Sequence, residues 1–264
     1  MSYISGSIEV FKCQEQTILI KKIVKIMEEN KSIMRNGVAS PDADYADVAT
    51  IPQKWLPKSL RPYSTSIVKW EHILPDDMPK PIEKILIRVN KELLHKELMY
   101  ADKTIPLWYN EAVKLWKAGE KDSALYKIAR CCHLIEDITV PMHCKVSSVI
   151  IDAWQSLNHI EANHKKFERL CGIRYVPNSH KYKIKIIKDL EKESHKIASK
   201  SRKIYKLCDE VGSTKLTKNP LTSWVTFLLP WLKEDYDKAI IMSYRRGEEY
   251  TVRLLYTFFK EINE

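Results

Sequence analysis

Hydrophobic side chains recur at helical spacing through most of the chain. Within residues 17–30, for example, Ile20, Ile23 and Met27 lie three or four positions apart, so they share one face of a helix. The remaining positions of this stretch are rich in lysine and glutamate. The pattern predicts an amphipathic helix over residues 17–30, with its apolar face packed on a core.

Similar patterns predict further helices, separated by stretches that contain proline or glycine. The proline-containing segment 37–66 is predicted to be a long loop. A content of only 6 glycines, with abundant lysine, leucine and glutamate, favours helix throughout. We therefore expect an all-α fold, a multi-helix bundle built as a single domain over residues 1–264. The other predicted helices cover residues 79–102, 106–118, 124–140, 152–170, 179–209, 221–232 and 234–262.

The segment 124–144 carries the most distinctive polar pattern. His133 and Asp137 lie four residues apart, at the edge of the predicted apolar face. Pro141 ends the helix, so the chain can turn and bring His143 back towards the same pocket. An imidazole and a carboxylate beside a core are costly unless they are compensated, and one metal ion would compensate both. A simple ion pair within the helix is the alternative explanation.

A second pair lies in the next predicted helix. His164 and Glu168 are again four residues apart, next to Phe167 on the apolar side. Two helices that each present a histidine and a carboxylate inward are typical of metal sites inside helical bundles. Nitrogen and oxygen donors suit zinc, with manganese or iron as alternatives. A solvated face, with His164 among basic neighbours, is the other interpretation.

Taken together, these residues resemble the zinc-dependent phospholipase C family, which also includes fungal and plant single-strand nucleases. The resemblance rests on His133, Asp137, Pro141, Met142 and His143, followed by the H-x-x-[FY]-E pattern from His164 to Glu168. Weaker similarity extends over nearly the whole chain. It implies a zinc site in the interior of the helical bundle.

The resemblance also implies which residues hold the zinc ions. One ion would be held by Asp44, His72, His133 and Asp137, and a second by His143, His164 and Glu168. The family's third metal uses the N-terminal residue of the mature protein and a histidine on the first helix. Gln16 stands at the position of that histidine. Two zinc ions are therefore expected, and the third site stays open.

The implied reaction is the hydrolysis of a phosphate ester. Zinc would polarise the phosphoryl oxygens and activate water for in-line attack at phosphorus, and Asp44 could act as ligand and general base. Tyr45 matches an aromatic position of the family's head-group pocket, whereas Lys69 stands where the family has a second aromatic residue. A lysine would repel choline, so an anionic head group or a nucleotide is the favoured substrate.

Charge points to partners that carry phosphate. The net charge is +10, and residues 180–206 hold ten Lys or Arg side chains against three acidic ones. Such a surface attracts nucleic acid or an anionic membrane, although a solvated helix without a partner fits equally well. No apolar stretch is long enough to cross a membrane and the start lacks a signal-peptide pattern. We expect a cytoplasmic protein, or a secreted one if a leader was removed.

The six cysteines show no C-x-x-C spacing and are predicted to be reduced and packed, with Cys132 or Cys144 as an alternative metal ligand. Three functions remain open at this level. The first is a phospholipase C-like hydrolase of lipid head groups, and the second is a nuclease or nucleotidase with the same type of metal site. The third is a non-hydrolytic metal-binding protein on this scaffold.

Overall fold

The computed structural model describes residues 3–15, 17–43, 49–50, 67–68, 101–144, 163–179, 182–212 and 230–264. These ranges are helical apart from loops and one antiparallel ladder of two-residue strands, β1 (Ala49–Thr50) and β2 (Ile67–Val68). The expected all-α fold is therefore confirmed. The helices are α1 (Ile4–Lys12), α2 (Ile18–Glu29), α3 (Lys31–Ala43), α5 (Ala101–Lys117), α6 (Lys121–Asp137), the short 3-10 helix η7 (Pro141–Cys144), α8 (Asn163–Arg174), α9 (Leu190–Gly212) and α12 (Pro230–Glu261).

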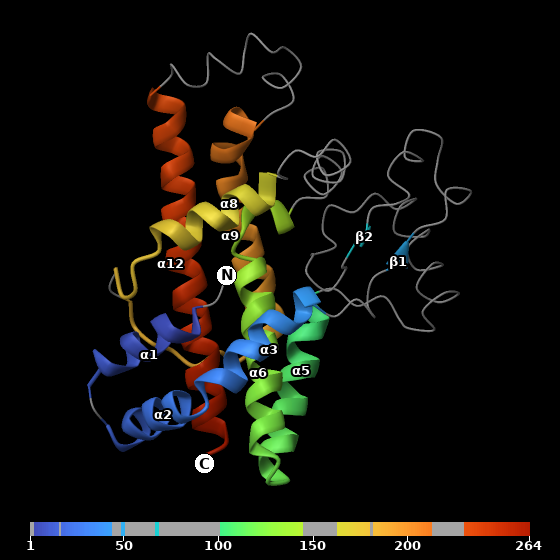
Figure 1. Ribbon diagram of the computed structural model, residues 1–264, viewed down its shortest axis with the longest axis vertical. Helices are drawn as coiled ribbons and strands as arrows, with labels where there is room; N and C mark the ends of the chain where they lie inside the picture. Colours follow the sequence, from blue (N-terminus) through green and yellow to red (C-terminus); the bar gives the residue numbers. More distant parts are fainter. Residues whose placement is uncertain are drawn as a thin grey trace.

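Helix α6 lies at the centre of the arrangement. Figure 1 shows α5, α6, α9 and α12 running close to the vertical, while α1, α2, α3 and α8 lie across them. Helix α6 packs against α5, α3 and α12, and the η7 turn that follows it packs against α9 and α8. The C-terminal end of α6 is therefore surrounded by several elements that are distant in sequence.

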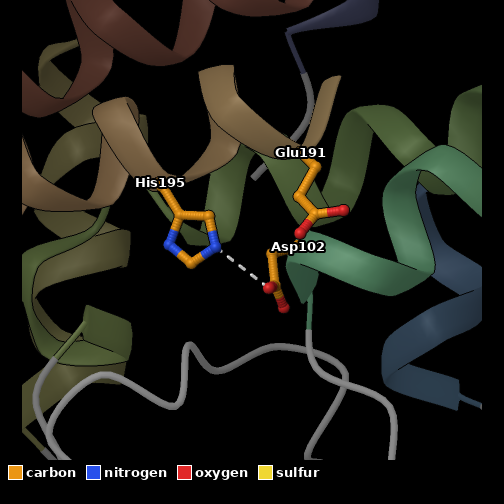
Figure 2. Close-up of side chains that lie close together, drawn as sticks. All are labelled: Asp102, Glu191 and His195. Carbon is orange, nitrogen blue, oxygen red and sulfur yellow. Dashed lines mark hydrogen bonds and ion pairs between the residues drawn. The ribbon is translucent and has the colours of Figure 1, made fainter. Parts of the chain in front are cut away.

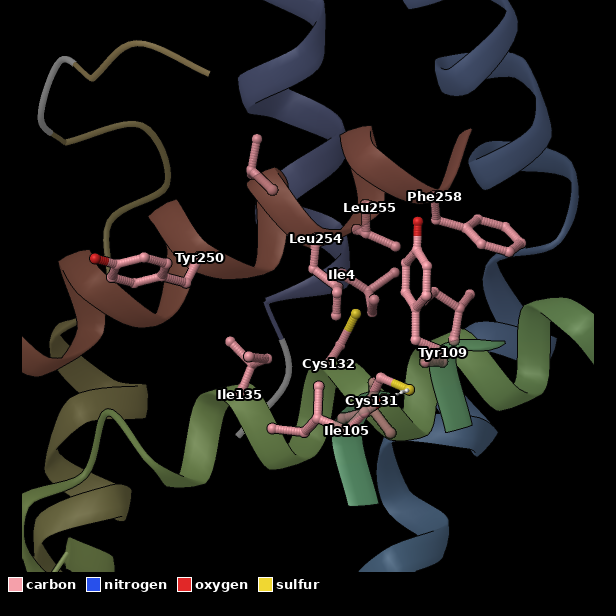
Figure 3. Close-up of a cluster of buried hydrophobic side chains, with 14 of the residues drawn as sticks. Ile4, Ile105, Tyr109, Cys131, Cys132, Ile135, Tyr250, Leu254, Leu255 and Phe258 are labelled. Atoms are coloured by element: carbon pink, nitrogen blue, oxygen red, sulfur yellow. Dashed lines mark hydrogen bonds between the residues drawn. The ribbon is translucent and has the colours of Figure 1, made fainter. Parts of the chain in front are cut away.

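The core forms where α6 faces α5 and α12. Cys132 and Ile135 of α6 lie opposite Leu254 on α12, and Ile4 of α1 fills the space beside them (Figure 3). On the α5 side, the Cys131 thiol donates a hydrogen bond to the carbonyl oxygen of Ile105, with a distance of 3.8 Å. This packing fixes α6 from both sides, and so fixes the polar residues at its end.

All six cysteines lie in the described ranges, and no disulfide joins any of them. Five are buried and Cys13 is exposed. Burial raises the pKa of the Cys131 and Cys132 thiols well above its ordinary value, because a thiolate would have to form without water around it. The prediction of reduced, mostly packed thiols is confirmed.

Several element boundaries agree with the sequence prediction. The predicted helix at residues 17–30 is α2, where the Thr17 hydroxyl accepts a hydrogen bond from the Ile20 N–H at 3.2 Å and caps the first turn. The predicted helix 234–262 is α12, which begins earlier, at Pro230. Helix α1, which buries Ile4 and Phe11, was not predicted. Residues 79–100 of the predicted helix 79–102, and most of the predicted helix 221–232, lie outside the described residues.

Other boundaries were predicted wrongly, and tertiary contacts explain two of them. Helix α3 continues through Gly37 to Ala43, within the segment predicted to be a loop, because Gly37 packs closely on α6. The basic helix does not start at residue 179 but at Leu190, because residues 182–187 are not helical and contact α12 instead. There the Ile187 N–H donates to the Thr257 hydroxyl at 2.9 Å.

Helix α5 starts at Ala101 and includes Pro106, which was predicted to begin a separate helix. Helix α6 ends at Asp137, four residues before the predicted stop at Pro141. Among the helices of the described ranges, none combines the length and the apolar composition needed to cross a bilayer.

Candidate metal centre

The site begins at the turn that ends α6. The Val140 N–H donates to the Asp137 carbonyl oxygen at 2.8 Å, and the His143 N–H donates to the Val140 carbonyl oxygen at 3.2 Å. Within the same turn, the Thr139 hydroxyl donates to the Glu136 carbonyl oxygen at 2.6 Å. These local bonds fold the chain back, and they place His143 beside the last residue of the helix.

Three predicted ligand residues meet at this turn. One ligand atom each of Asp137, His143 and Glu168 lies within 4.8 Å of the other two. Glu168 comes from α8, and its Oε1 atom is 3.1 Å from Nε2 of His143. The Asp137 side chain is buried, whereas those of His143 and Glu168 are 17% and 28% exposed. The group is therefore buried at Asp137 and partly open to solvent at His143 and Glu168.

His133 extends the group into the protein. Its Nε2 atom lies 3.1 Å from Oδ2 of Asp137, one helical turn further along α6, and its side chain is only 4% exposed. The sequence interpretation placed these two residues at the edge of the apolar face, and the structure buries both of them. Removing an imidazole and a carboxylate from water has a cost that this contact offsets in part.

The other predicted ligands and substrate contacts lie wholly or partly outside the described residues. His164 lies on α8, one turn before Glu168, but its side chain is outside the described part. Asp44, Tyr45, Lys69 and His72 lie outside the described residues altogether. Their assignments as ligands or as substrate contacts stay predictions.

The donor set fits a zinc ion chemically. Two imidazoles and two carboxylates, without thiolate, are ligands that zinc accepts in proteins, and manganese and iron accept them too. Among the described residues, neither Cys132 nor Cys144 belongs to the cluster, and the Cys144 thiol donates to the Ile138 carbonyl oxygen at 3.2 Å. Thiol ligation has no geometric support here.

Sequence reasoning missed Glu136, a fully buried carboxyl group beside Asp137. Its Oε1 atom accepts a hydrogen bond from the Tyr3 N–H at 3.0 Å, and within the described part of the chain Oε2 has no hydrogen-bond partner. Burial raises the pKa of Glu136 to about 8. The signal was available, because Glu136 lies one helical turn after the inward-facing His133 and therefore on the same side of α6.

Tyr3 ties the start of the described chain to this end of α6. Its ring packs edge-on against Tyr175, with centroids 4.8 Å apart, and a Cβ atom on Gly247 of α12 would come within 2.4 Å of it. Tyr3 thus contacts Glu136, helix α12 and the segment that follows α8. The candidate centre is supported from behind by these contacts.

Comparisons with known proteins give a fold but no sequence family. No family model matches the chain, and no curated protein does. Among solved structures, the fold is similar to that of Alpha Toxin from Clostridium absonum, with a TM-score of 0.62 and 15% identity over 99% of this chain and 63% of that one. The alpha-toxin of Clostridium perfringens from avian strain SWCP aligns with a TM-score of 0.49 and 13% identity, over 98% of this chain and 62% of that one.

The chain therefore spans less than two thirds of the length of the alpha-toxins that it matches. At 15% identity the likeness concerns the fold and does not extend to activity. The fold of this chain is therefore similar to that of part of the Clostridium absonum alpha-toxin.

Proposed function

We propose that this protein is a zinc-dependent phosphodiesterase of the phospholipase C type, which hydrolyses phosphate esters. The single observation that carries the proposal is the meeting of Asp137, His143 and Glu168, with ligand atoms within 4.8 Å of one another. These are residues of the motifs that resemble the zinc-dependent phospholipase C family. The fold shared with an alpha-toxin supports the same proposal.

In this proposal the ligands divide into two groups. His133 and Asp137 hold one ion together with Asp44 and His72, and His143 and Glu168 hold another together with His164. Zinc held in this way would lower the pKa of bound water towards about 7 and would polarise phosphoryl oxygens. A third ion has no assigned ligands in this chain.

The protein side chains have separate tasks in the proposed reaction. His133 is held on Asp137 and buried, so its ring orientation is fixed before any ligand arrives. His143 and Glu168 form the side that opens to solvent, and we assign the approach of the substrate to that side. Asp44 is the proposed general base, which takes the proton of the attacking water.

The proposed substrate carries negative charge next to the scissile phosphate ester. Lys69 occupies the position of an aromatic head-group contact in the family. Exposed lysines also lie along α9 and along the segment just before it. These are Lys183, Lys185, Lys188, Lys192, Lys196 and Lys203. An anionic phospholipid or a nucleotide suits this charge. A nuclease of the same metal-site type is the second candidate, because the same lysines would bind a nucleic-acid backbone.

The first test measures metal content and hydrolysis together. At the candidate metal centre we expect about two zinc ions per chain by elemental mass spectrometry, and turnover of at least one substrate among an anionic phospholipid, a single-stranded nucleic acid and a generic phosphodiester. His133→Ala and Glu168→Gln should each lower both zinc content and turnover, the latter by about 100-fold or more, because ligand loss removes the activated water. Glu29→Gln on α2 changes the same type of side chain at an exposed position and should leave both unchanged.

The pattern of activity separates the three functions. Turnover of the phospholipid without the nucleic acid supports the phospholipase, and salt-sensitive turnover of the nucleic acid supports the nuclease. Bound zinc with no turnover of any substrate would leave a metal-binding protein. Full turnover in the His133→Ala protein would contradict the assignment of the site.

A further inference from the structure

A second group of side chains that can bind a metal ion lies between α5 and α9. Asp102 is in the first turn of α5, and Glu191 and His195 lie one turn apart at the start of α9. Figure 2 shows the three side chains converging, with Nε2 of His195 at 3.0 Å from Oδ2 of Asp102. One ligand atom from each residue lies within 4.8 Å of the other two.

The carboxylate of Asp102 is the unusual member of this group. Asp102 is 4% exposed, and its Oδ1 atom is buried with no hydrogen-bond partner in the described part of the chain. An ionised carboxylate in that position is stabilised on one oxygen only. A cation bound beside it would satisfy the buried charge, because a metal ion can bind either or both oxygens of a carboxylate.

We propose that Asp102, Glu191 and His195 form a second binding site for a divalent cation of the zinc class. Imidazole and carboxylate are donors that zinc accepts, and three protein ligands leave a position open for water, as in open zinc sites. The side chains of Glu191 and His195 are 46% and 38% exposed, so the ion reaches the site from solvent and keeps positions for water. Such a site joins the start of α5 to the start of α9.

Lys103 competes for one of the three ligands. Its Nζ atom forms an ion pair with the carboxylate of Glu191, and it follows Asp102 directly in the chain. Without a metal ion, Lys103 supplies the positive charge that Glu191 faces. A bound divalent cation takes over that role, and Lys103 then repels it. This competition gives the proposal a signature that a purely structural contact between α5 and α9 does not have.

The first experiment counts zinc ions on the full-length chain by equilibrium dialysis and elemental mass spectrometry. Glu191→Gln and His195→Gln should each lower the number of bound ions by one relative to the wild type. They should do so again when combined with His143→Gln, which removes a ligand of the candidate metal centre instead. The additive loss distinguishes this site from the proposed catalytic one. Equal zinc content in the wild type, Glu191→Gln and His195→Gln would overturn the proposal.

The second experiment measures zinc affinity by calorimetry in the His143→Gln background. Lys103→Gln should tighten binding about threefold to tenfold, because a positive charge next to the ion is removed. Lys192→Gln removes the same charge from an exposed position on α9, about 100° further round the helix, and should change the affinity less than twofold. If Asp102, Glu191 and His195 serve only to hold the two helices together, Lys103→Gln lowers the melting temperature and leaves zinc binding unchanged.

Discussion

Glu136 has an environment unlike that of an ordinary surface glutamate. Its carboxyl group is buried next to Asp137, and the Tyr3 N–H is its hydrogen-bond donor. Burial raises its pKa to about 8, so the folded protein holds a proton at neutral pH that the unfolded chain releases. Folding at this position is therefore coupled to proton uptake.

The coupling predicts how the stability of the metal-free protein changes with pH. Below the unfolded pKa of about 4.5 the neutral carboxyl group is fully compatible with the fold, and this contribution is lost as the pH rises to about 8. The loss is on the order of 5 kcal/mol over that window. Glu136→Gln keeps an oxygen for the Tyr3 N–H and cannot ionise, so its free energy of unfolding should lack this decline.

Urea unfolding at intervals between pH 5 and 8.5, with a chelator present, measures the difference. The wild type and Glu136→Gln should have similar stability at pH 5 and diverge as the pH rises. Parallel curves for the two proteins would contradict the assignment of a proton to Glu136.

At this scale the sequence predicted the residues that share a local motif. His133 and Asp137 are one helical turn apart, and Pro141 signals the turn that returns His143, so their proximity follows from the chain itself. Asp102 and His195 are 93 positions apart and belong to no shared motif. Only the packing of α5 against α9 brings them together, and the spacing of apolar residues along the sequence does not predict which helices pack against each other.

Among the elements, α3 shows how a contact can overrule a local signal. Gly37 and Pro41 indicated a loop, yet the helix continues through both. A Cβ atom at Gly37 would come within 2.5 Å of the Tyr126 carbonyl oxygen on α6, so the glycine permits α3 to cross α6 closely. Helix α9 shows the converse, because residues 182–187 before it contact α12 and are not helical despite a helical pattern.

The close crossing makes Gly37→Ala informative. At an exposed helical position this change stabilises by about 1 kcal/mol, since alanine favours helix over glycine. Here the methyl group meets backbone atoms of α6 that cannot rotate away, so we expect destabilisation of about 1–3 kcal/mol. Asn36→Ala, at an exposed position on the same helix, should be neutral or slightly stabilising. Urea unfolding of the three proteins tests the sign, and a more stable Gly37→Ala protein would disprove the tight crossing.

For the molecule as a whole, the all-α fold followed from the apolar period, but the order in which helices pack did not. The candidate metal centre links α6 and η7 to α8 through the pair His143 and Glu168. If zinc binds there, it stabilises only the folded chain, since the unfolded chain does not hold these side chains together. Metal binding and global stability should therefore be coupled.

Chelation should lower the melting temperature by about 5–10 °C for each ion removed when zinc was present at 100 times its dissociation constant. Differential scanning calorimetry with and without a chelator measures the shift. In the His133→Ala protein the same treatment should give less than half of it. Identical melting temperatures for the wild type with and without zinc would argue against a metal site in the folded protein.

The distribution of thiols has a practical consequence for following the opening of this molecule. Cys13 is exposed at the end of α1, while the other five thiols are buried in the core. An alkylating reagent can therefore mark the native protein once, and each further mark records a moment when the surrounding helices separated. The labelling rate of each buried thiol therefore reports how often its part of the protein opens. Cys131 and Cys132 report on the region between α5 and α12, and Cys171 and Cys208 on α8 and the end of α9.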